Sequence, residues 1–328
     1  MKLLKEKYEG LPEVDNLSED LKTFLLKPTI QEALQNNDFN TLYKELPLDY
    51  ASYFTHLMSS LNIDPLEYLD YVPAWFLADT TIKNINIPSH IKYIGNSAFR
   101  YCSNLESITI PDNVATIGED AFYNCGSLTS ITIPDEVTSI GENAFYGCIS
   151  LTSVTIPDSV TSIGIATFAW CTALTNVIIG NSVTSIGDNA FYHCSGLVRI
   201  SIPDSVITIG SYAFEGCNSL ESVTIGGSVT SIGHHAFIEC VSLTSVAIPD
   251  GVTSIGESTF KRCKKLTNII IPDSVTSIGT WAFEHCRSLT SIKYTGTKNQ
   301  WHKIYFRDEW YEDSPIETIH CVDGDITL

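Results

Sequence analysis

The sequence has few basic residues and no long apolar run. A helix that spans a membrane needs about 20 consecutive apolar residues, and no stretch of the 328 residues comes near that length. Only 19 lysines and arginines stand against 38 acidic residues, which gives a formal net charge of −19. Binding to a phosphate backbone requires clustered basic side chains. We therefore expect no membrane span and no nucleic-acid partner.

Motifs that carry catalysis or hold cofactors are also missing. The sequence contains no phosphate-binding glycine loop, no nucleophile elbow, no H-E-x-x-H motif and no C-x-x-C pair. Charges in residues 1–7 interrupt the apolar core that a secretory signal needs. These absences predict a protein that is not an enzyme and has no cofactor or metal. They also predict a location in the cytoplasm or within a particle.

What the sequence does contain is a repeat of 23 residues. One unit reads I-G-x-x-A-F-x-x-C-x-x-L-x-x-I-x-I-P-x-x-V-x-x, and it occurs nine times. Self-similarity at a fixed period is the signature of a solenoid, in which each unit contacts only its neighbours. The sequence therefore predicts a stack of coils.

Each unit predicts two extended pieces and a return. Residues 128–133 alternate apolar and β-branched polar side chains, as a half-buried strand does. Pro134-Asp135 favours a turn, residues 137–140 are a second short extended piece, and the stretch to Cys148 is a short helical or irregular return. Stacked units then form a parallel sheet along the solenoid, with strands about 4.8 Å apart.

The repeat resembles the BspA-like leucine-rich repeat family over about residues 71–328. The resemblance is carried by phases such as Ile140-Gly141, Ala144-Phe145, Cys148, Leu151 and Ile156-Pro157. Residues 294–297 with Trp301 also resemble an end cap of this family. The resemblance implies a curved solenoid that binds proteins or surfaces, often on the cell surface, and it implies no catalytic residues.

The chain divides into four parts at the sequence level. Residues 1–70 predict a helical cap or docking domain, with helices near 18–26, 29–36, 48–61 and 65–71. Residues 71–93 are a degenerate opening repeat, residues 94–293 the solenoid, and residues 294–328 a degenerate closing repeat and tail. Simple addition of the period puts Val72 at the position of the Ile-Gly glycine and Phe306 beneath Phe283, with Glu309 at the cysteine position.

The column of cysteines allows two interpretations. Metal sites require clustered ligands, and stacked equivalents point in parallel, which does not suit disulfides. A free cysteine behaves as a small buried hydrophobe, so we expect the column to be structural core, with Cys321 outside it. The nine members are Cys102, Cys125, Cys148, Cys171, Cys194, Cys217, Cys240, Cys263 and Cys286.

Variation concentrates in the return segments, where aromatic residues and histidines recur. Exposed aromatic side chains are frequent binding anchors, and the alternative is that their rings pack between neighbouring returns. The candidates are Tyr101, Tyr123, Tyr146, Trp170, Tyr192 and His193. The Ser and Thr residues of the strands, in contrast, suit a solvated β-face, although a regular Thr ladder can also bind an ordered polymer.

One basic patch stands out in this acidic chain. It consists of Lys261, Arg262, Lys264 and Lys265. Such a patch either meets an anionic partner or is merely solvated, and four charges are too few to indicate nucleic-acid binding.

Together these features predict a scaffold that binds a protein partner. The alternatives are a structural component of a larger assembly, such as a phage particle or a cell-surface layer, and an adhesin that binds carbohydrate.

Overall fold

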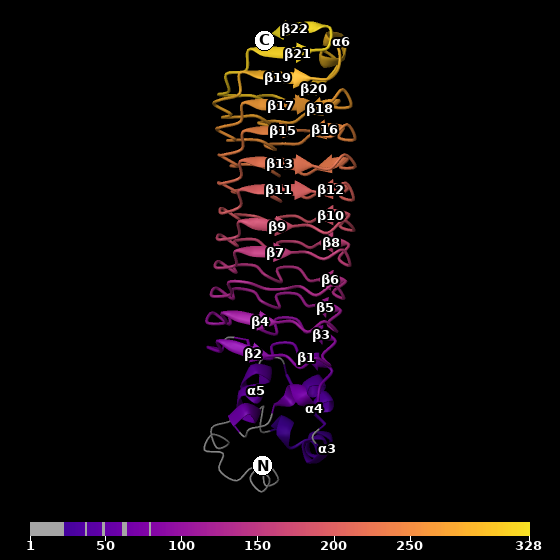
Figure 1. The fold of residues 1–328 in the computed structure, drawn as a ribbon, viewed down its shortest axis with the longest axis vertical. Helices are drawn as coiled ribbons and strands as arrows, with labels where there is room; N and C mark the ends of the chain where they lie inside the picture. The colour runs from indigo at the N-terminus through magenta and orange to yellow at the C-terminus, as the bar shows by residue number, and fades with distance from the viewer. Residues whose placement is uncertain (1–22, 37, 48–49, 61–63, 79) are drawn as a thin grey trace.

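The computed structural model describes residues 23–36, 38–47, 50–60, 64–78 and 80–328. They form a solenoid of about 11 stacked turns, with short helices at one end and a two-stranded hairpin at the other (Figure 1). The expected repeat solenoid is confirmed. Its helices and strands lie in three groups: an N-terminal helical layer and two columns of parallel strands.

The helical layer contains α3 (Pro28–Asn36), α4 (Phe39–Glu45), α5 (Ala51–Ser60) and the 3₁₀ turn η3 (Pro65–Glu67). Helix α4 was not expected; Asp38 caps it by accepting a hydrogen bond from the Thr41 amide at 3.1 Å. The expected helix over 65–71 is wrong. It stops after η3 because the chain then enters the sheet as β1 (Tyr71–Val72). Most of the helix expected near 18–26 lies outside the described residues.

A column of short strands runs along one side of the solenoid, and each strand combines a more exposed polar or tyrosine side chain with a more buried apolar one. This column begins with β1 and continues through β3 (Tyr93–Ile94), β5 (Thr116–Ile117), β6 (Ser139–Ile140), β8 (Ser162–Ile163), β10 (Ser185–Ile186), β12 (Thr208–Ile209), β14 (Ser231–Ile232), β16 (Ser254–Ile255), β18 (Ser277–Ile278) and β20 (Tyr305–Phe306). Neighbours that pair do so in parallel, for example Ser185 with Thr208.

The second column holds the longer strands. It comprises β2 (Asn84–Asn86), β4 (Ser107–Thr109), β7 (Ser153–Thr155), β9 (Asn176–Ile178), β11 (Arg199–Ile202), β13 (Ser222–Ile225), β15 (Ser245–Ala247), β17 (Asn268–Ile271), β19 (Ser291–Tyr294), β21 (Thr318–Cys321) and β22 (Gly324–Thr327). The strand expected over 128–133 is reduced to a single bridge between Ser130 and Ser107. Strand β22 runs antiparallel to β21 and closes the stack.

Two ladders run through the interior beside the buried leucine, isoleucine and valine side chains. Phenylalanine rings from Phe99 to Phe283 lie face to face, with centroids 5.2–5.6 Å apart. Beside them each cysteine thiol from Cys125 onward donates a hydrogen bond to the carbonyl of the phenylalanine one coil earlier, at 3.0–3.3 Å. The nine column cysteines are buried, and none of them forms a disulfide. Burial raises the pKa of the eight thiols from Cys125 to Cys286, to about 12 for Cys217.

The opening coil is one residue shorter than simple addition of the period suggested. Tyr71 pairs with Tyr93 and Val72 with Ile94. Val72 therefore lies beneath the isoleucine of the Ile-Gly pair and not beneath the glycine. The Val72 side chain is fully buried. This burial agrees with the position of the isoleucine, which is apolar in every coil, and not with that of the glycine, which has no side chain to bury.

The closing coil is shifted in the opposite direction. Phe306 pairs with Ile278 rather than lying beneath Phe283, because α6 (Lys298–Trp301) is inserted ahead of it. The indole of Trp310 takes the place beneath the Phe283 ring, with centroids 6.1 Å apart. Ser314 Oγ donates to the Phe283 carbonyl, as the column thiols do. Ser314 is thus the cysteine equivalent, and not Glu309.

Candidate binding surface

The return edge is the surface formed by the segments between each Ile-Gly pair and the following leucine. In each coil two of its residues, four apart, have a positive φ. The first series is Ser97, Asp120, Asn143, Ala166, Asn189, Tyr212, His235, Ser258 and Trp281. The second series is Tyr101, Asn124, Gly147, Trp170, His193, Gly216, Glu239, Arg262 and His285.

This left-handed backbone suits glycine and asparagine, and it costs other residues about 1–2 kcal/mol. Several coils obey that preference, for example at Asn124 and Gly147. Others place large side chains there, at Tyr101, Trp170 and His193, with φ of 59°, 61° and 54°. The return edge therefore combines a regular backbone with side chains that the backbone does not favour.

At the N-terminal end of the return edge, one arginine organises several rings. The Arg100 guanidinium lies 4.5 Å from the Tyr123 ring centroid and 5.6 Å from that of Trp75. It also forms an ion pair with Asp120 at 2.5 Å. Tyr123 stacks on Tyr146 at 4.7 Å, and burial raises the pKa of the Tyr123 hydroxyl, with Tyr146 and Tyr101 adding to the effect. These rings form a packed but half-exposed group.

In the middle of the return edge, rings stack in pairs across neighbouring coils. Trp170 lies on His193 with centroids 4.4 Å apart, and the Tyr192 ring meets Trp170 edge-on at 5.9 Å. Tyr212 lies on His235 at 4.6 Å. Trp170 still exposes 39% of its surface and Tyr212 exposes 37%. Part of each ring face is thus covered by a neighbour, and the remainder faces solvent.

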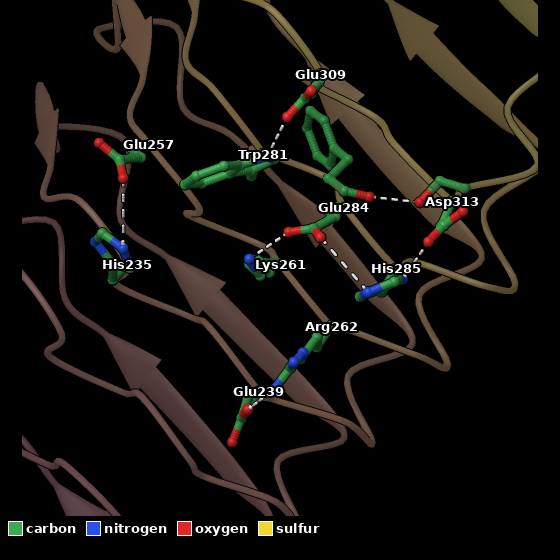
Figure 2. A network of polar contacts seen from close by, with 12 residues as sticks. His235, Glu239, Glu257, Lys261, Arg262, Trp281, Glu284, His285, Glu309 and Asp313 are labelled. Carbon is green, nitrogen blue, oxygen red and sulfur yellow. Dashed lines mark hydrogen bonds and ion pairs between the residues drawn. The ribbon is translucent and has the colours of Figure 1, made fainter.

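The C-terminal third of the return edge is a polar network (Figure 2). The Lys261 ammonium lies 4.7 Å from the Trp281 ring centroid and pairs with the buried Glu284. Trp281 Nε1 donates to Glu309 at 2.8 Å. His285 lies 3.5 Å from Glu284 and 3.3 Å from Asp313. This network ties the last full coil to the closing coil.

A second histidine forms a separate pair beside this network (Figure 2). His235 Nε2 lies 4.0 Å from a carboxylate oxygen of Glu257. Burial lowers the pKa of His235; Glu257 opposes this effect, whereas His234 and Lys261 add to it. The neutral imidazole therefore dominates at neutral pH, and its ring is free to stack on Tyr212.

The basic patch is divided by its contacts. Lys261 is drawn into the network beneath Trp281, and Arg262 pairs with Glu239 at 2.6 Å. Lys264 is exposed and has no salt bridge among the described residues, and the same holds for Arg287 one coil later. Sequence reasoning missed Arg287, although it lies one period after Lys264 and the repeat itself could have revealed it. Lys265 is exposed beside Lys264.

A hollow of about 400 Å³ lies where these side chains meet. Its lining consists of Asn218, Glu239, Val241, Arg262, Lys264, His285 and Arg287. The described residues contain no group of three or more His, Cys, Asp or Glu side chains that could hold a metal ion. Within the same described part of the chain, no helix is long and apolar enough to cross a membrane.

The repeats match a family model described as a BspA type leucine-rich repeat region, over residues 70–198 and 184–310. The chain belongs to this family. Curated protein sequences gave no match to this BspA-type repeat protein. Solved structures of other leucine-rich repeat proteins did match.

Three of these structures are bacterial proteins with moderate sequence identity to this BspA-type chain. A leucine-rich cell surface protein of Faecalibacterium prausnitzii is 28% identical, covers 68% of this chain and 90% of its own, and has a TM-score of 0.35. The T. pallidum leucine-rich repeat protein is 32% identical. The match covers 49% of this chain and 78% of that protein, with a TM-score of 0.47. A leucine-rich repeat protein of Bacteroides ovatus is 28% identical. The match covers 74% of this chain and 84% of that protein, with a TM-score of 0.34.

Proposed function

We propose that this protein is a non-enzymatic scaffold that binds a protein partner through the return edge. The observation that carries the proposal is the set of aromatic and histidine side chains on left-handed backbone. Tyr101, Trp170 and His193 occupy positions where Asn124, Gly147 and Gly216 stand in other coils. Strained backbone that persists points to a function for the side chain it carries.

The exposed ring surface supports a protein partner. Aromatic side chains provide large contact area with few rotatable bonds, and they dominate the energetics of protein interfaces. The stacked pairs hold Trp170 and Tyr212 in place before any partner arrives, which lowers the entropy lost on binding. The partner would therefore meet a pre-ordered row of half-exposed rings.

The test removes rings without harming the fold. In Trp170→Asn/His193→Asn both rings are lost, while asparagine suits the left-handed backbone, so the variant stays folded. We expect full-length protein to capture a partner by cross-linking in extract of its own cells, and this variant to lose about 90% of that capture, because interface anchors are worth about 2 kcal/mol each.

The matched control lies on the strand face. Ile178→Thr removes an exposed apolar side chain, at 53% exposure, from a strand position where other coils carry threonine. It should leave capture unchanged. Equal loss in both variants would count against the return edge, and ring-dependent retention on a neutral glycan array without any protein capture would favour the carbohydrate adhesin instead.

A further inference from the structure

We propose that the hollow at Arg262, Lys264 and Arg287 binds an extended acidic peptide segment of the partner. The proposal rests on the proposed protein-binding function and names the chemistry of one contact. It starts from an imbalance of charge: the chain carries a net −19, yet Lys264 and Arg287 are exposed cations without a salt bridge among the described residues.

The repeat arranges the lining in two parallel columns. Asn218, Val241, Lys264 and Arg287 stand one period apart in consecutive coils and form the first column. The other three lining residues, Glu239, Arg262 and His285, belong to the second left-handed series and form the second column. Coils stack about 4.8 Å apart, so the first column is about 14 Å long. That length suits about four residues of extended chain and is far too long for a single small anion.

The available donors suit carboxylates. Arg262 gives Nη1 to Glu239, which leaves the remaining N–H groups of its guanidinium for another acceptor. Lys264 and Arg287 lie at one repeat position in adjacent coils, so two carboxylates on one face of an extended peptide can pair with both. Asn218 offers an amide that both donates and accepts, and Val241 offers an apolar contact.

The acids around the hollow argue against a densely sulfated glycan. Glu239 belongs to the lining, and Glu284 and Asp313 flank His285. A polymer with a charge on every sugar would lie against these carboxylates, and like charges repel. A peptide places its acidic side chains on alternate faces and can avoid them.

The test is fluorescence anisotropy of the full chain with fluorescein-labelled octaglutamate at low salt. The same protein should bind labelled octaglutamine far more weakly. In Lys264→Glu/Arg287→Glu, affinity for octaglutamate should fall at least about tenfold, because two charge-assisted contacts become repulsive. The matched control Lys293→Glu/Lys303→Glu reverses two exposed lysines outside the hollow and should change affinity less than about twofold.

Three results would overturn the proposal. They are equal binding of octaglutamate and octaglutamine, an equal loss in the control variant, and hollow-dependent binding of a heparin octasaccharide without binding of octaglutamate. If octaglutamate fails while ring-dependent capture of a partner persists, the hollow is wrong and the scaffold function stands. If ring-dependent capture fails as well, the scaffold function is wrong too.

Discussion

At the scale of single residues, the left-handed positions distinguish side chains that suit the backbone from side chains that the backbone does not favour. Where a coil carries asparagine or glycine, side chain and backbone agree. Ala166 is an exception without a ring: it has a φ of 50° and is 8% exposed, and the equivalent residues of the adjacent coils are Asn143 and Asn189. It therefore offers a measure of the backbone cost alone.

We expect Ala166→Asn to raise the free energy of unfolding by about 0.5–1 kcal/mol, because asparagine tolerates the left-handed region better than alanine. The midpoint of urea denaturation measures the change. Ala173→Asn is the control, since Ala173 has no positive φ and asparagine stands at the same repeat position in Asn104. A gain at Ala173 as large as that at Ala166 would contradict the backbone explanation.

At the scale of elements, the two ends of the stack differ in how they stop it. Helices cover the opening coil, whereas the closing coil ends the phenylalanine ladder with an aromatic ring that lies nearly perpendicular to it. The Trp310 indole meets Phe283 at 81°, after a ladder in which consecutive rings lie within 14° of parallel. It also contacts Trp301 and Phe306. The ladder thus ends in an edge-on cluster.

We expect Trp310→Ala to destabilise the closing coil by about 3–5 kcal/mol, because a large buried ring leaves a cavity. The loss should stay local, since coils interact with nearest neighbours. Hydrogen exchange should therefore speed up in β20 and β21 and not in β8 and β10, and Trp310→Phe should restore most of the protection. Uniform acceleration along the whole solenoid would contradict this account.

How much of this followed from the sequence depends on whether the period held. Inside the regular coils, spacing alone predicted the buried column and the strands, apart from the strand over 128–133 that is reduced to one bridge, because each unit must bury the same phases. At the ends it failed: the α6 insertion moved Phe306 from Phe283 to Ile278. Residue types indicated the return-edge candidates, but the pairing of Trp170 with His193 depends on backbone directions that no spacing reveals.

At the scale of the whole molecule, one buried chemistry repeats along the entire axis. Burial raises the pKa of the eight thiols from Cys125 to Cys286, to about 12 for Cys217 and Cys286. The unfolded chain releases these protons near pH 9, while the folded chain retains them. Stability is therefore complete below pH 9 and falls as the pH rises above it.

Each such thiol should lower the free energy of unfolding by about 1.4 kcal/mol per pH unit above pH 9. We expect a steep loss between pH 9 and pH 10, where ordinary tyrosines with a pKa near 10 are at most about half ionised, measured by urea denaturation under reducing conditions. Cys171→Ala/Cys194→Ala should reduce the slope by about a quarter, whereas Cys321→Ala should reduce it less than either column cysteine does, because burial also raises the pKa of this thiol but it is only partly buried. A flat profile to pH 10 would contradict the burial of the thiols.

The constant 23-residue offset between stacked partners has a consequence for inheritance. A cut at any phase of a regular coil, rejoined one period away, leaves the same neighbours facing each other across the seam. Unequal recombination between the tandem DNA repeats that encode the coils can therefore lengthen or shorten the molecule by whole coils. The helical end and the closing hairpin would stay unchanged. The length of the solenoid would then be set by the number of repeats in the gene.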